Sequence, residues 1–303
     1  MKQSLLTFFK GMAMGAADIV PGVSGGTVAM LVGIYTRLVD AIHNIGPTTL
    51  LQIKREGLVA AWRSIDGAFL LALLAGIFSS VVLFARLIQF LMQTYPVLLW
   101  SFFFGLVIIS AVLVARQIKH WQLPQICGLI IGAVLAAGIS LMAPTEISAT
   151  PLNLFWGGAL AICAMILPGI SGSFILLLLG LYAPVIAAVK GMDLPLLAVF
   201  AAGCVLGILA FSRILSWLLH HYADLTLAVL TGFMAGALVK IWPWKEVLLY
   251  RLDSHGQSVP VQELPVWPFA VQDPQLLGAI LLASGAIVLV LVLEWASKKI
   301  VVE

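Results

Sequence analysis

Apolar residues run through this chain in stretches long enough to cross a lipid bilayer. A transmembrane helix needs about 20 mostly apolar residues. Six stretches meet this requirement, at residues 67–92, 97–115, 125–142, 195–219, 225–241 and 276–294. Hydrophobic residues make up 62% of the chain and charged residues 10%, whereas soluble domains carry about 25% charged residues. The sequence therefore predicts an all-α polytopic membrane protein, with one integral membrane domain over residues 1–303.

Charge and cysteine content exclude several other classes. The net charge of +3 is too small to indicate a nucleic-acid partner. Cys127, Cys163 and Cys204 all lie in apolar stretches, which is typical of small core residues and not of a disulfide framework or a metal site. We expect no metal and no cofactor, and the sequence has no motif of a serine hydrolase or a nucleotide-binding loop. Enzymatic chemistry is not expected.

Two further apolar stretches, residues 4–42 and 153–188, are interrupted by similar motifs. Pro-Gly-Val-Ser-Gly-Gly occupies residues 21–26, and Pro-Gly-Ile-Ser-Gly-Ser occupies residues 168–173. Proline and repeated glycine disfavour a helix interior. Non-helical backbone at membrane depth persists only where it is buried in protein or lines a cavity. Each stretch is therefore predicted to form a re-entrant hairpin of two half-helices that meet at a loop inside the membrane.

The two broken stretches belong to an internal duplication. The motifs align with an offset of 147 residues, and the alignment extends to the triplets Gly-Ile-Tyr at 33–35 and Gly-Leu-Tyr at 180–182. Further along, the offset becomes 127 and five identities follow: Gly76, Phe84, Arg86, Tyr95 and Gly105 stand opposite Gly203, Phe211, Arg213, Tyr222 and Gly232. The chain thus contains two repeats, residues 1–145 and 150–300.

Each repeat is predicted to be one re-entrant hairpin followed by three transmembrane helices. Three is an odd number, so the second repeat enters the membrane from the opposite side, giving an inverted-topology repeat. With both termini cytoplasmic, five of the sixteen basic residues face outward: Arg86, Lys190, Lys240, Lys245 and Arg251. The other eleven face inward, as the positive-inside rule requires. Residues 43–66 are predicted to form an interfacial cytoplasmic helix, and residues 242–275 an external loop at the headgroup layer.

The motifs themselves are candidate anion sites. A helix that begins at a break offers unpaired backbone N–H groups and the positive end of its dipole, and glycine lets a ligand approach. The candidate substrate-binding residues are Ser24, Gly25, Gly26 and Thr27 in the first motif and Ser171, Gly172 and Ser173 in the second. Inverted repeats would bring both motifs together near the midplane. The alternative is that these small residues only permit tight helix packing.

Asp18 precedes the first motif, and its counterpart in the second repeat is Met165. A carboxylate in hydrocarbon costs about 2.5 kcal/mol or more on insertion scales, so an intramembrane acid is a functional candidate. We expect Asp18 to carry a coupling proton or to bind a coupling cation such as sodium. The alternative is that Asp18 caps a half-helix.

Arg86 and Arg213 occupy equivalent positions in the two repeats. The guanidinium group suits the geometry of phosphate. We expect each arginine to receive an anionic head group when the site opens to its side of the membrane. The alternative is that both side chains extend to the membrane interface.

The first motif in its context, Gly-Met-Ala-Met-Gly-Ala-Ala-Asp-Ile-Val-Pro-Gly-Val-Ser-Gly-Gly-Thr at 11–27, resembles the signature of the bacterial polyprenyl-phosphate transporters (PopT), formerly a domain of unknown function. Leu-Pro-Gly-Ile-Ser-Gly-Ser at 167–173 also fits, and the resemblance extends over the whole chain. It implies a flippase of the cytoplasmic (inner) membrane that returns undecaprenyl phosphate from the outer to the inner leaflet, recycling the carrier lipid of envelope synthesis. The resemblance supplies no residue-level mechanism.

Two functions therefore stay open at this point. The first is translocation of a lipid phosphate, for which the membrane lipid is the partner. The second is a transporter or channel for a small inorganic anion, since helix-end loops alone indicate only a phosphate-like anion.

Overall fold

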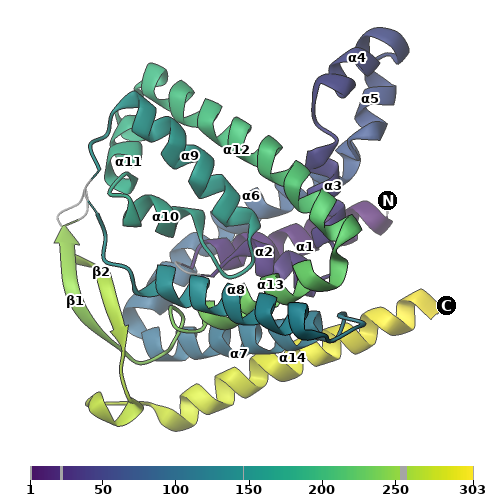
Figure 1. Cartoon of the computed structure of the whole chain (residues 1–303). Coiled ribbons are helices and arrows are strands. Elements are labelled where there is room, and N and C mark those ends of the chain that lie inside the picture. Colours follow the sequence, from purple (N-terminus) through teal and green to yellow (C-terminus); the bar gives the residue numbers. More distant parts are fainter. Residues whose placement is uncertain (1, 21–22, 146, 253–257, 303) are drawn as a thin grey trace.

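The computed structural model describes residues 2–20, 23–145, 147–252 and 258–302. Most of these residues are helical, and the helices form one bundle (Figure 1). The first half contains α1 (Lys2–Asp18), α2 (Gly25–Leu31), α3 (Tyr35–His43), α4 (Pro47–Glu56), α5 (Leu58–Ser64), α6 (Gly67–Thr94), α7 (Pro96–Ala115) and α8 (Leu123–Leu141). The second half contains α9 (Pro151–Ile166), α10 (Gly172–Leu178), α11 (Tyr182–Lys190), α12 (Leu194–His221), α13 (Ala223–Ala237), strands β1 (Lys245–Leu252) and β2 (Ser258–Pro265), the 3-10 turn Pro268–Ala270, and α14 (Leu276–Val302).

Five helices of the described chain are long and apolar enough to cross a membrane, or up to seven spans if each bent helix pair counts as one. The five are α6, α7, α8, α12 and α14, and each coincides with a stretch predicted from the sequence. The sixth predicted span, 225–241, differs. Its helix α13 ends at Ala237 after 15 residues, which gives about 22 Å at 1.5 Å per residue and is short for hydrocarbon about 30 Å thick.

Each broken stretch contains three helices, two of which form a bent pair, so the prediction of two half-helices meeting at one loop is confirmed only in part. The first motif separates α1 from α2, and the second separates α9 from α10. A second break bends α2 against α3 by 116° and α10 against α11 by 109°. Gly33 and Gly180 lie at these bends with φ of +70°, a conformation that glycine adopts without steric cost. Pro21 and Gly22 lie outside the described residues.

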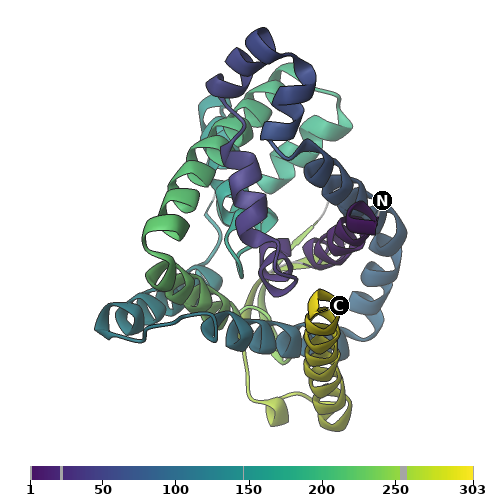
Figure 2. The same cartoon turned by 90° about the vertical axis from the view of Figure 1, so that its right-hand side faces the viewer.

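Long-range packing follows one pattern in both halves. Helix α1 packs against α6 as α9 packs against α12, and α7 packs against α14 as α13 packs against α8. Viewed from the end that carries both termini, the first bent pair lies between α6 and α12 (Figure 2). The main hydrophobic core surrounds this pair and includes buried side chains of α1, α2, α3, α6, α7, α12 and α13.

The connecting segments contain more structure than the sequence predicts. The predicted interfacial helix at 43–66 is two helices, α4 and α5, that meet at Gly57 with φ of +86°. The segment 242–275, predicted as a loop, contains the antiparallel hairpin of β1 and β2. Val247, Tyr250, Val259 and Val261 supply residue types that favour strands. The hairpin lies at the end of the molecule opposite the two termini (Figure 1).

Candidate functional site

The two breaks predicted from the sequence lie in contact. Ser24 is the N-cap residue of α2, and its side chain is 1% exposed. The Ser24 hydroxyl lies 3.1 Å from the carbonyl oxygen of Leu167 and 3.3 Å from that of Met165, and it donates to this pair. The same oxygen accepts from the N–H of Gly26 at 3.1 Å. One serine therefore starts α2 and holds the backbone of the second break.

Two more hydroxyl groups of the first bent pair reach the second break. The Thr27 hydroxyl oxygen accepts from the N–H of Gly169 at 3.0 Å. The Tyr35 hydroxyl donates to the carbonyl of Ile166 at 3.2 Å. Both side chains are buried, Thr27 completely. Because these partners are main-chain groups, only the fold could reveal them, and Tyr35 was not among the predicted site residues.

The close approach also explains one glycine of the first motif. A Cβ at Gly26 would stand 2.6 Å from the carbonyl oxygen of Ile166, which is closer than real Cβ contacts come. Gly26 thus serves tight packing, the alternative considered from the sequence, while the neighbouring hydroxyls form the polar contact.

Asp18 is the last residue of α1, and its carboxylate lies beside the first residue of α2. Its Oδ1 accepts from the N–H of Gly25 at 2.6 Å, so the carboxylate satisfies one of the orphan donors of the helix. A Cβ at Gly25 would stand 2.5 Å from Asp18 Oδ2, so glycine leaves room for the carboxylate. The capping role considered as an alternative is therefore present in this structure. The start of α2 is occupied by an anionic group of the protein itself.

The second break lacks such a carboxylate, because Met165 stands where the first repeat has Asp18. Ser171 is the N-cap residue of α10, yet its side chain makes no capping hydrogen bond. Its hydroxyl instead lies 2.8 Å from that of Ser173. Ser171 is buried, and Ser173 is exposed. The two breaks are thus chemically different although their motifs match.

The two matched arginines lie in unlike surroundings. Arg213 on α12 donates to the carbonyl of Leu209 at 2.8 Å and to that of Ile45 at 3.2 Å. Arg86 on α6 is exposed. Within the described part of the chain, no hydrogen bond joins either guanidinium to the residues of the breaks. The receiving role expected for both therefore stays a prediction.

A polar contact between α3 and α12 was not expected. Asp40 Oδ1 accepts from the Ser216 hydroxyl at 2.6 Å, and Asp40 Oδ2 lies 3.8 Å from Nε2 of His220. Asp40 and Ser216 come from different repeats, 176 residues apart. The spacing of acids along the sequence could not predict this partner.

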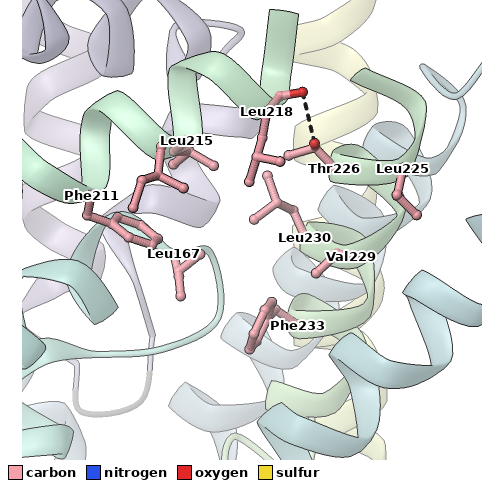
Figure 3. A pocket seen from close by; sticks show the side chains of 10 residues that line it. Leu167, Phe211, Leu215, Leu218, Leu225, Thr226, Val229, Leu230 and Phe233 are labelled. Carbon is pink, nitrogen blue, oxygen red and sulfur yellow. Dashed lines mark hydrogen bonds between the residues drawn. The ribbon is translucent and has the colours of Figure 1, made fainter. Parts of the chain in front are cut away.

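An apolar cavity of about 190 Å³ adjoins the second break, between α12 and α13 (Figure 3). Its lining is Leu167, Phe211, Ile214, Leu215, Leu218, Leu225, Thr226, Val229, Leu230 and Phe233. The hydroxyl of Thr226 is satisfied by the Leu218 carbonyl at 3.1 Å, drawn in Figure 3. Leu167 belongs to both environments, because its side chain lines this cavity while its carbonyl oxygen accepts from Ser24.

The described residues offer no group of three or more His, Cys, Asp and Glu side chains that could hold a metal ion. The polar chemistry of the site consists of hydroxyl groups, main-chain groups and one carboxylate. Hydroxyl and main-chain N–H groups can donate hydrogen bonds to an anion, whereas an ionised carboxylate repels one.

Replacement of Ser24 by alanine is expected to weaken the contact between the breaks. The variant loses the N-cap acceptor and the donor to the second break, which together amount to about 1–2 kcal/mol of stability. The measurement is the unfolding midpoint in detergent, together with transport. Ser110→Ala is the matched control, since Ser110 is equally buried but bonds only within its own helix, to Leu106. Equal midpoints for both variants would contradict the assigned role of Ser24.

Comparison with known proteins identifies the family of the chain. Residues 14–259 match the VCA0040-like family, described as undecaprenyl phosphate translocase-like. The chain is 50% identical over 300 residues to a polyprenyl-phosphate transporter of Vibrio cholerae serotype O1, covering 97% of each chain. It is 31% identical over 260 residues to a polyprenyl-phosphate transporter of Staphylococcus aureus, covering 78% of this chain and 86% of that one. No solved structure matches. The chain is thus a multi-pass membrane protein that belongs to the polyprenyl-phosphate transporter family, a family of transporters and not of enzymes.

Proposed function

We propose that this protein returns undecaprenyl phosphate from the outer to the inner leaflet of the bacterial cytoplasmic membrane. The observation that carries the proposal is that Leu167 joins a polar and an apolar environment. Its carbonyl oxygen accepts from the Ser24 hydroxyl where the two breaks meet, and its side chain lines the apolar cavity. A lipid phosphate needs this combination, since its head group is polar and its tail is not. The cavity is smaller than the roughly 300–1,000 Å³ typical of sites that enclose a whole ligand. It therefore receives a segment of the tail, and the remainder stays in lipid.

The head group passes the contact of the breaks, where Ser24, Thr27, Ser171 and Ser173 provide hydroxyl groups. Gly25, Gly26 and Gly172 are packed against Asp18, Ile166 and Ala161 in this structure. The phosphate therefore approaches their main chain only when these contacts open. Arg86 and Arg213 receive the head group on the two sides of the membrane. For Arg213, this requires exchange of its bonds to the carbonyls of Leu209 and Ile45.

The two halves, residues 1–145 and 150–300, form an inverted-topology repeat in this proposal. The reciprocal packing of α1 with α6 and α9 with α12 supports it, as do the similar bends of 116° and 109°. Both termini face the cytoplasm. The support for this orientation is the position of the two terminal helices at one end of the molecule, with the β-hairpin at the other (Figure 1), together with the distribution of basic residues.

Asp18 couples transport to an ion gradient. Two like charges about 4 Å apart repel by about 4 kcal/mol at an effective dielectric constant of 20, so an ionised Asp18 opposes a phosphate at the start of α2. Protonation neutralises the carboxylate and weakens its bond to the N–H of Gly25. The phosphate head and the proton are therefore taken up together. A sodium ion bound to the carboxylate would neutralise it in the same way.

Reconstitution into liposomes tests the proposed substrate. Labelled undecaprenyl phosphate placed in one leaflet is expected to reach the other leaflet only when the protein is present, and protein-free liposomes are the control. Chloride and inorganic phosphate fluxes are measured in the same vesicles. If the protein moved either inorganic anion and left the labelled lipid in its original leaflet, it would be a small-anion transporter.

A further inference from the structure

Two lysines share one carboxylate beside the β-hairpin. Lys240 follows α13, and Lys245 begins β1. Their ammonium groups lie 3.4 Å and 3.5 Å from the same oxygen, Oε2 of Glu263 on β2. The three side chains are only 12%, 7% and 16% exposed, in that order. The cluster therefore carries one positive charge more than it can neutralise, with little access to water.

Such an excess of buried charge is costly unless another group pairs with it. Contacts with aromatic rings offset part of this free-energy cost. Lys245 Nζ lies 3.5 Å from the centre of the Trp100 ring on α7, and Lys240 Nζ lies 4.7 Å from that of the Phe174 ring on α10. A ring face attracts a cation but supplies no countercharge. Burial lowers the pKa of Lys245 to about 8, although Glu263 acts in the opposite direction.

The segment that bears the lysines is held firmly. Between them, the indole N–H of Trp242 donates to the carbonyl of Val266 at 2.9 Å, and that of Trp244 donates to the carbonyl of Pro274 at 2.8 Å. The Trp242 ring also contacts those of Phe104 and Trp244. The two ammonium groups are therefore positioned before any ligand arrives, which lowers the entropic cost of binding.

The cluster is adjacent to the second break. Phe174, which faces Lys240, follows Ser173 directly in α10. The β-hairpin, which carries Lys245 and Glu263, lies at the end of the molecule opposite the termini (Figure 1). A phosphate that bridges both lysines would thus lie at this end, close to the start of α10 and to the second break.

We propose that Lys240 and Lys245 form a binding site for a phosphate monoester, the head group of a polyprenyl phosphate, before it enters the contact between the breaks. A doubly charged phosphate bridges the two ammonium groups and displaces Glu263, which acts as an internal competitor for the lysines. The identity of the lipid rests on the proposed function. The anion site itself rests on the geometry of the cluster.

The test is binding to the purified full chain in detergent, with farnesyl phosphate, inorganic phosphate and farnesol as probes and ligand-dependent thermal stabilisation as the readout. Farnesyl phosphate is expected to stabilise the protein, and farnesol is not. Lys240→Gln and Lys245→Gln each lose a charge-assisted contact and are expected to weaken binding about tenfold or more. Lys190→Gln, an exposed lysine of α11, is the matched control for the loss of one positive charge.

Glu263→Gln separates a binding site from a structural ion pair, because the two roles give opposite results. Removal of the competing carboxylate is expected to strengthen binding of farnesyl phosphate, even where the unliganded protein is less stable. A purely structural cluster would instead give weaker or unchanged binding. Equal affinity for inorganic phosphate and farnesyl phosphate would indicate a site for free phosphate and would overturn the lipid assignment.

Alkaline pH provides an independent readout. Above pH 7 the phosphate monoester is already mostly doubly charged, since its second pKa is about 6. As the pH rises through about 8, Lys245 loses its proton, so binding should weaken. Lys245→Arg keeps its charge throughout this range and should bind with little change. Glu263 and Lys240 are the charged groups that face Lys245.

The binding assay tests the lysine site and the flipping assay tests the proposed function, so the two proposals can fail separately. Lysine-dependent binding of farnesyl phosphate without lipid flipping in liposomes would retain the site and contradict the function. Lipid flipping, together with binding of farnesyl phosphate that is unchanged in both lysine variants, would retain the function and contradict the site.

Discussion

Asp18→Asn is expected to abolish the response of transport to an ion gradient. The substitution preserves the size of the side chain and an oxygen that can accept from the N–H of Gly25, now 2.6 Å from Asp18 Oδ1. It removes the charge that an incoming phosphate must neutralise. The stimulation by a proton or sodium gradient should disappear, a loss within the range of about 5–150-fold typical of coupling between two ligands. Exchange of lipid between leaflets without a gradient should persist.

The measurement is flipping of labelled undecaprenyl phosphate in liposomes, with and without each gradient, over a range of pH. Asn and Asp are comparable capping residues, so a pure cap predicts wild-type behaviour of Asp18→Asn and a defect only in Asp18→Ala. Asp40→Asn is the matched control, since Asp40 lies in α3 of the bent pair whose first helix Asp18 caps, but it contacts Ser216. Wild-type transport by Asp18→Asn at every pH would falsify the coupling role. A gradient response lost only in Asp40→Asn would move that role to Asp40.

Long apolar runs were enough to predict most spans. The predicted 67–92 and 97–115 correspond to Gly67–Thr94 and Pro96–Ala115, because a helix in lipid must satisfy its own backbone and its length is set by the bilayer. Pro96 stands in the first turn of α7, a position that proline favours. The short helix α13 shows the weakness of this approach, since apolar residues continue beyond Ala237 where the helix does not.

The bent pairs were predicted only in part. The first motif does break the helix, because Ser24 caps a new helix there. The second break at Gly33 was used only to align the repeats, although glycine beside a helix end is a known signal of a left-handed residue. Its positive φ depends on the direction of the following helix, which apolar periodicity does not encode.

The contacts at the site were beyond sequence reasoning for a different reason. Ser24, Thr27 and Tyr35 bond to main-chain groups of residues 131–143 positions away, and main-chain groups are the same at every residue. The lysine cluster was missed because 242–275 was interpreted as an external loop at the headgroup layer, with no strands. Only the pairing of β1 with β2 brings Glu263 to Lys245.

Gly203→Ala is expected to destabilise the helix bundle strongly. Helix α12 crosses α9 at Gly203, and the two helices are so close there that an added Cβ would overlap the carbonyl oxygen of Phe155. Main-chain atoms cannot move aside as a flexible side chain can, so the helices must separate. Overpacking of this kind costs about 1–3 kcal/mol or more. The unfolding midpoint in detergent should fall, and transport should fall with it.

Gly76→Ala should reproduce this result, because Gly76 on α6 meets the carbonyl of Phe8 on α1 in the same way. The two contacts are equivalent in the two repeats, because Gly76 corresponds to Gly203 and Phe8 corresponds to Phe155. Gly138→Ala and Gly285→Ala are matched controls, since a Cβ at either position meets nothing within 4 Å. Alanine in an open helix position gains up to about 1 kcal/mol over glycine, so these controls should be neutral or stabilising. If Gly76→Ala and Gly203→Ala behaved like the controls, the close crossings of α1 with α6 and α9 with α12 would be wrong. A defect in one and not the other would contradict equivalent packing in the two repeats.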